Sequence, residues 1–353
     1  MKPPNLPPIS TGIPFTRKAF PKVALPFKSL TANLHPDLVE MIKLNPSEYL
    51  AIIPFGAGKK FNEENPMAGA LFTEFIKTLG LDLGGLSIAK ATPALPPRSD
   101  FDAPWIYILE GGSESLRNFL LWQQTLAATP KIAFSVVPFD LSLHSWVIAN
   151  ISGDIVSDDP KVICRALGVI KKKLWHDQDF RRITYQCLTA MGIQASSTAC
   201  AFYTTLTFDI HYAPNLVKDA AAPMWILMGK PITTDTTLHQ QYLRIIRNAT
   251  YFVGMHKLEI NKRWLDCVWC KSDTHPAHQC PLPQMDDWLG PKPNRDERLD
   301  IHPSSSKGSN NNRAYSNSDQ HRGGYSRGSG HSRNRGRGRG RGNGSRGGNR
   351  ERK

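Results

Sequence analysis

The chain lacks a continuous apolar run of about eighteen residues, the minimum for a helix that crosses a bilayer. Its N-terminus also lacks the positive segment, apolar segment and small-residue cleavage site of a secretory signal peptide. These absences argue against a membrane partner and against an oxidising compartment. We therefore expect an intracellular protein, in the nucleus, the cytoplasm or both.

Acidic residues are scarce at both ends of the chain. None occurs before Asp37, and residues 301–353 contain thirteen Lys or Arg against only Asp319 and Glu351. This last segment carries a net +11 of the formal +14 of all 353 residues. Because the positive charge is concentrated in one polar segment, RNA or single-stranded DNA is the expected partner.

Catalytic constellations are also missing. The segment Phe55 to Lys60 has Gly-Ala-Gly-Lys but lacks the first glycine of a phosphate-binding loop and the hydroxyl residue after the lysine. The segment Gly111 to Ser115 lacks the second glycine of a nucleophile elbow. The carboxylates form no metal-binding cluster in the sequence. The sequence therefore predicts a binding protein and not an enzyme.

One stretch does contain the elements of a metal site. Residues 267–280 have the spacing C-x2-C-x4-H-x4-C, with three thiols and an imidazole at fixed intervals. Tetrahedral zinc takes four ligands of these two types. The alternative, buried or disulfide-bonded cysteines, does not fit a reducing compartment. His278 is a rival ligand by chemistry but not by spacing.

This spacing resembles the CCHC zinc knuckle of retroviral and retrotransposon Gag-type proteins and of many cellular RNA-binding proteins. The resemblance implies Zn²⁺ as the cofactor, with Cys267, Cys270, His275 and Cys280 as ligands. Where the retroviral pattern has small glycines, this chain has Lys271 and Thr274. Trp269 and Trp264 are candidate base-stacking rings, with Lys271 beside them. Packing inside the loop is the alternative for either tryptophan.

The C-terminal segment, residues 303–353, is rich in Arg-Gly pairs and has almost no apolar residues, so we expect it to be disordered. It resembles the RGG tails of RNA-binding proteins, in which arginine contacts phosphate and stacks on bases. A solubilising linker is the alternative. The arginines expected to contact nucleic acid are Arg322, Arg327, Arg335, Arg337, Arg339, Arg341 and Arg346.

Between the two ends the pattern predicts a globular α/β fold. We expect a Pro-rich, basic, disordered arm at 1–35, a strand-helix unit at 36–91, an α/β domain at 99–255 and the knuckle at 264–283, with a Pro-rich joint at 92–98. Within 99–255, alternating apolar residues predict a strand over 202–212, and 4-3-4-3 spacing predicts a helix over 236–253. The order of elements favours a ferredoxin-like or RRM-like sheet. The apolar stripe of the 236–253 helix is either core or the seam of a homo-oligomer.

The order of parts, a globular region, then a CCHC knuckle, then a basic tail, resembles Gag-like proteins of retrotransposons. It is most similar to the first-reading-frame RNA-binding proteins of non-LTR elements, in which an RRM-like domain precedes the knuckles. That resemblance implies a zinc-dependent protein that packages or chaperones single-stranded RNA. Two alternatives remain: a host RNA-processing or ribonucleoprotein factor, and a protein-interaction scaffold with a structural zinc clip.

Overall fold

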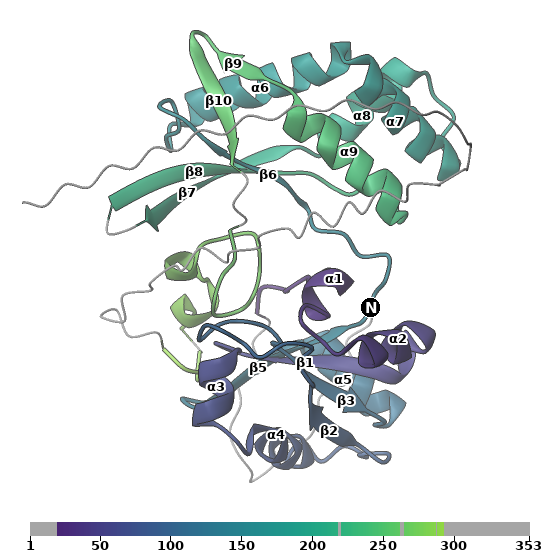
Figure 1. The fold of residues 1–353 in the computed structure, drawn as a ribbon, viewed down its shortest axis with the longest axis vertical. Coiled ribbons are helices and arrows are strands. Elements are labelled where there is room, and N and C mark those ends of the chain that lie inside the picture. Colours follow the sequence, from purple (N-terminus) through teal and green to yellow (C-terminus); the bar gives the residue numbers. More distant parts are fainter. Residues whose placement is uncertain (1–19, 218–219, 262–264, 287, 293–353) are drawn as a thin grey trace, which may run out of the picture. The chain divides into compact units, whose positions relative to one another are not determined.

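A computed structural model of the 353-residue chain describes residues 20–217, 220–261, 265–286 and 288–292. Among these residues, no helix is long and apolar enough to cross a membrane. The fold is mixed α/β and is built on two antiparallel five-stranded sheets (Figure 1). The CCHC segment follows the last strand of the second sheet.

The first sheet uses residues 49–138 and has the strand order β2-β3-β1-β5-β4. Its strands are β1 (Tyr49–Pro54), β2 (Ser87–Lys90), β3 (Tyr107–Glu110), β4 (Thr125–Thr129) and β5 (Ile132–Pro138). The helices of this part are α1 (Phe27–Leu30), α2 (Pro36–Leu44), α3 (Lys59–Glu64), α4 (Ala68–Lys77) and α5 (Glu114–Gln123), with a short 3-10 turn at Pro46–Glu48.

Both faces of the first sheet are covered at its middle strand, which explains why β1 is apolar at every position and buried throughout. On one face, Leu50 and Ile52 pack with Phe72 and Phe75 of α4 and with side chains of α5. On the other, alternate strand residues pack against the segment from Phe20 to α2 and against the CCHC segment. Figure 1 shows α4 and α1 on opposite sides of this sheet.

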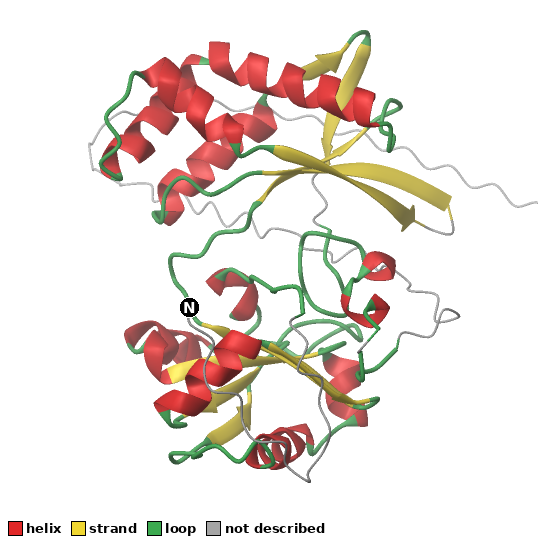
Figure 2. Cartoon of the chain, turned by 180° about the vertical axis from the view of Figure 1, so that it is seen from behind, coloured by secondary structure: helices red, strands yellow, loops and turns green. Residues whose placement is uncertain are grey.

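The second sheet uses residues 147–261 and has the strand order β7-β8-β6-β10-β9. Its strands are β6 (Val147–Ser152), β7 (Asp209–Val217), β8 (Ala220–Met228), β9 (Tyr251–Val253) and β10 (His256–Asn261). Figure 2 shows the helices of this part gathered on one side of the strands, where they form a shared core with the sheet. They are α6 (Pro160–His176), α7 (Gln178–Ala190), α8 (Ser197–Leu206) and α9 (Thr236–Asn248).

The two sheets have the same topology. Each follows the chain order strand, helices, strand, strand, helix, strand, strand, and each places its first strand in the middle, between its third and its fifth. All the strand pairs within them are antiparallel. The chain order begins like the ferredoxin-like βαββαβ pattern, but the position beside the first strand, which the fourth strand occupies in a ferredoxin-like sheet, is taken here by the fifth, and the fourth lies at the edge. The chain therefore contains this topology twice.

The expected mixed α/β fold is thus confirmed, but the strand order differs from a ferredoxin-like or RRM-like sheet, and the expected joint between domains is wrong. The proline-rich stretch at 92–98 is not a joint between domains, because β2 before it pairs with β3 after it, with Ile88 opposite Leu109. Prolines can lie in a connection between two strands of one sheet without separating domains. One domain ends and the next begins between β5 and β6, at residues 139–146.

The expected strand at 202–212 is also wrong over its first half. Ser196 caps α8 by accepting a hydrogen bond from the backbone N–H of Ala199 at 3.2 Å, and the helix continues to Leu206. Its buried side is formed by Cys200, Ala201, Thr204 and Thr205, which is the spacing of a helix. The prediction was wrong because the aromatic and threonine residues at 202–208 also fit the alternating pattern that is typical of a strand. Similarly, α9 ends at Asn248, and Val253 belongs to β9.

The arm expected to be disordered over 1–35 is structured from Phe20 onward, and residues 1–19 lie outside the described part. Phe20, Val23, Leu25 and Leu30 are buried on the first sheet. Gln124 fixes this segment through two hydrogen bonds to Val23, one from the Val23 N–H at 2.7 Å and one to its carbonyl at 2.9 Å. The apolar residues between the prolines explain the difference, because their burial offsets the cost of ordering the chain.

Candidate metal centre

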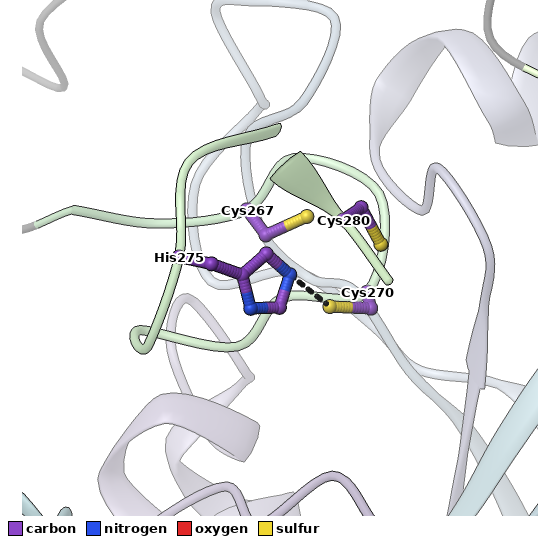
Figure 3. A group of neighbouring side chains, drawn as sticks. All are labelled: Cys267, Cys270, His275 and Cys280. Atoms are coloured by element: carbon purple, nitrogen blue, oxygen red, sulfur yellow. Dashed lines mark hydrogen bonds between the residues drawn. The ribbon is translucent and has the colours of Figure 1, made fainter. Parts of the chain in front are cut away.

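Four side chains converge in the segment that follows β10. The nearest ligand atoms of Cys267, Cys270, His275 and Cys280 all lie within 4.8 Å of one another. The three cysteines are buried, and His275 is half-buried. Figure 3 shows the three sulfur atoms and the imidazole directed toward a common centre. Within the described residues, this is the only such group of three or more His, Cys, Asp or Glu side chains.

The geometry fits a tetrahedral zinc ion. The Cys270 Sγ and the His275 Nε2 are 3.4 Å apart. Zinc binds sulfur at about 2.3 Å and nitrogen at about 2.0 Å, so two ligands at tetrahedral angles are separated by roughly 3.5 Å. With three protein thiolates and one imidazole the coordination would be closed, as in structural zinc sites, because no position is left for water or substrate.

A hydrogen bond selects which nitrogen of His275 faces the cluster. The Nδ1 atom lies 3.0 Å from the Thr274 hydroxyl, which leaves Nε2 directed at the sulfurs. A partner on the far nitrogen is the usual way in which a ligating histidine is oriented. His278 is exposed in the 3-10 turn Ala277–Gln279 and lies outside the cluster, so the spacing correctly favoured His275.

A tight turn presents the first two cysteines. The N–H of Lys271 donates to the carbonyl of Cys267 at 2.8 Å, and the N–H of Cys267 donates to the carbonyl of Ser272, also at 2.8 Å. Lys271 has a φ of 65°, in the left-handed region that glycine adopts most easily. This is the position at which retroviral knuckles have a small glycine. The backbone geometry is therefore retained without the glycine.

The three thiols perturb one another because they are buried and close together. Burial by itself would raise the pKa of Cys267, but hydrogen bonds from Cys270, Cys280 and His275 lower it well below its usual value. A hydrogen bond with Cys267 raises the pKa of Cys280 and helps to raise the pKa of Cys270 to about 12. Without a cation, the cluster thus favours one thiolate, whereas zinc would stabilise all three in the deprotonated form.

Trp269 lies under this turn and packs on the first sheet. It is 9% exposed, and its ring stacks on Phe55 with centroids 5.6 Å apart and an interplanar angle of 12°. The edge of Phe101 contacts it from another side at 5.8 Å, and the Trp269 carbonyl accepts a hydrogen bond from the N–H of Gly56 at 2.8 Å. The expected base-stacking position is therefore occupied by protein rings, and the packing alternative describes Trp269.

Lys271 is also buried, although it was expected to contact nucleic acid. It is 4% exposed, and its ammonium lies 5.3 Å from the ring centre of Phe101 and 5.2 Å from that of Trp105. Burial lowers its pKa to about 8, against the opposing effect of the neighbouring thiols and carboxylates. Two aromatic faces and a cluster of thiols solvate this cation in place of water. Lys271 does not face solvent in this arrangement.

The other residues expected to contact nucleic acid lie outside the described part of the chain. They are Trp264 and the seven arginines of the C-terminal segment. The partners of Trp269, by contrast, were not singled out in the sequence. Phe55 follows the apolar run at 49–54, and Phe101 and Trp105 follow the Pro-rich stretch at 92–98, so only the burial of apolar rings in general could have indicated them.

The centre is continuous with the core of the first sheet. Cys267, Cys270, Cys280, Leu282 and Trp288 belong to the same buried cluster as the strand residues. The CCHC segment is therefore not the separate module expected at 264–283. In comparisons with known proteins, no family model, no curated protein and no solved structure matches this chain.

Proposed function

We propose that this chain is a zinc-dependent nucleic-acid-binding protein whose partner is single-stranded RNA. The observation that carries the proposal is the convergence of Cys267, Cys270, His275 and Cys280 in a closed, buried cluster. The basic Arg-Gly segment at 303–353 supports it, because a net +11 in a polar segment suits phosphate binding. Packaging or chaperoning of RNA, as in Gag-like proteins, is the activity that these parts would serve together.

In this proposal, zinc has a structural role. Trp269 and Lys271 are covered by the first sheet, so the zinc turn does not supply the base contacts. The ion would instead fix the chain after β10 on that sheet, since a short loop with few apolar residues does not keep this shape alone. This burial also favours the alternative of a protein-interaction scaffold with a structural zinc clip, in which RNA binding would be absent.

The two functions are distinguished by crosslinking in cells, followed by sequencing of the bound RNA. The full chain is compared with Cys270→Ser, which removes one zinc ligand, and with a chain lacking residues 303–353. We expect RNA to be recovered with the full chain and its yield to fall in both variants. Recovery of no RNA with the full chain would reject RNA binding and leave the scaffold with its zinc clip.

A further inference from the structure

A second surface has the composition that single-stranded nucleic acid requires, and it lies far along the chain from the zinc ligands. It is formed by α6 and α8, and we call it the α6–α8 surface. Phe202 and Tyr203 of α8 are 44% and 53% exposed, although aromatic rings of this size are usually buried. The residues that define the surface are Lys171, Lys172, Trp175, Phe202 and Tyr203.

The rings of this surface form a contiguous row. Trp175 and Phe202 have ring centroids 5.4 Å apart, and Phe202 and Tyr203 have centroids 6.2 Å apart. The indole is fixed in place because its Nε1–H donates to the Thr205 hydroxyl at 2.8 Å. Fixed rings lose little conformational freedom on binding, which favours them as contact residues.

Cations flank the row of rings. Lys171 and Lys172 precede Trp175 by one helical turn, so they share its side of α6, and Lys172 is exposed. Arg181 donates from Nε to the Trp175 backbone carbonyl, which places a third cation at the C-terminal end of α6.

Two carboxylates that closely follow Trp175 in the chain have other partners. Asp177 accepts the N–H of Phe180 at 2.8 Å, and Asp179 pairs with Arg182 at 2.7 Å.

We propose that the α6–α8 surface binds single-stranded RNA by stacking unpaired bases on Phe202 and Tyr203 while Lys171 and Lys172 contact phosphates. Flat rings next to lysines suit this ligand, because every base has a stacking face and every nucleotide carries a negative charge. The inference rests on the proposed function and deepens it. It assigns the base contacts to helices of the second α/β domain, because the zinc turn does not supply them.

The test measures binding of the full chain to a fluorescent single-stranded oligouridine and to duplex RNA of equal length, at raised salt so that the contribution of the basic tail is small. The variant is Phe202→Ala with Tyr203→Ala. We expect its affinity for the single strand to fall by roughly fivefold to a hundredfold, the range for loss of base stacking, with duplex binding unchanged. The matched control is Phe252→Ala, which removes a phenylalanine that is 52% exposed on β9 and should change neither affinity.

A second variant covers the case in which the double substitution unfolds the protein. Lys172→Glu changes an exposed side chain and should weaken single-strand binding while the unfolding temperature stays the same. If the wild-type chain binds the oligouridine and both variants bind it equally well, the α6–α8 surface is not the site, although the proposed function stands. If the wild-type chain does not bind it, both proposals fail. A change of sedimentation mass without loss of RNA binding would overturn the inference and identify a self-association surface.

Discussion

The indole of Trp269 lies nearly parallel to the ring of Phe55, with the ring centres 5.6 Å apart. Trp269 is two residues beyond Cys267, and Phe55 directly follows β1, so this contact joins the candidate metal centre to the middle strand of the first sheet. The shape of the zinc turn and the packing of the sheet therefore depend on each other. The CCHC segment is in this respect part of the core of the first sheet and not an independent module.

Replacing Trp269 with alanine should destabilise the protein. The change removes a buried ring from contact with Phe55 and Phe101, so we expect the free energy of unfolding to fall by about 3–5 kcal/mol. Urea denaturation of the zinc-loaded chain measures it. Trp146→Ala is the matched control, because that ring is 49% exposed and its loss should cost much less. Unchanged stability together with weaker single-strand binding would restore the base-stacking role of Trp269.

Lys271→Met should weaken zinc binding. Three thiolates and one zinc ion leave a single net negative charge, and the buried Lys271 ammonium is the cation placed to offset it. We expect a loss of about tenfold in zinc affinity, as for other groups that support metal ligands, measured by competition with a chromophoric chelator. Lys131→Met, which changes an exposed lysine, is the control. Equal affinities in the two variants would show that the charge of Lys271 is not required.

Acidification should destabilise the second domain through His239. This residue of α9 is 4% exposed and stacks on His144 at a centroid distance of 4.1 Å. Burial, with smaller effects of His144 and Arg247, lowers its pKa from 6.5 to about 4. The unfolded chain therefore binds a proton that the folded chain does not, and stability is lost as the pH falls from about 6.5 to about 4, by up to about 3 kcal/mol.

His239→Phe keeps a flat ring against His144 and removes the titrating group. We expect the free energy of unfolding of this variant to depend less on pH between about 4 and 6.5 than that of the wild type. His256→Gln, a change at an exposed histidine of β10, should retain the wild-type pH dependence. Parallel pH profiles for the wild type and His239→Phe would exclude His239 as the cause.

The basic segment should account for most of the salt dependence of RNA binding. Removal of residues 303–353 should weaken binding and reduce the slope of log affinity against log salt, because fewer counterions are released. Substituting glutamine for Arg335, Arg337, Arg339 and Arg341 should reduce that slope by up to about 3 for a single strand. A slope that both changes leave intact would assign the segment to a spacer role.

How far the sequence predicts this structure depends on how local the signal is. Asp159 followed by Pro160 is a local signal for the start of α6, and Ser113 is one for the start of α5, because a cap acts on the next three residues. The four residues of the candidate metal centre were predictable for the same reason, because they all lie in one short segment. The strand pairing across residues 92–98 could not be predicted, since it depends on partners distant in the chain.

The burial of Trp269 could not be predicted from the sequence, for a different reason. An aromatic residue in a metal-binding turn has the same sequence pattern whether it contacts RNA or protein. The deciding partner, Phe55, lies more than two hundred residues earlier. The repetition of the fold was hidden as well, because the two α/β domains share an order of elements but no evident sequence motif.

The most direct test of the account is the zinc content of the purified full chain, measured together with its thermal unfolding before and after treatment with a strong chelator. We predict one zinc ion per chain in the wild type and none in Cys270→Ser. We also predict a lower unfolding temperature both for the chelated protein and for the variant, because the ion stabilises the segment that packs on Phe55. Absence of zinc from the wild type, or bound zinc whose removal leaves the unfolding temperature unchanged, would contradict the account.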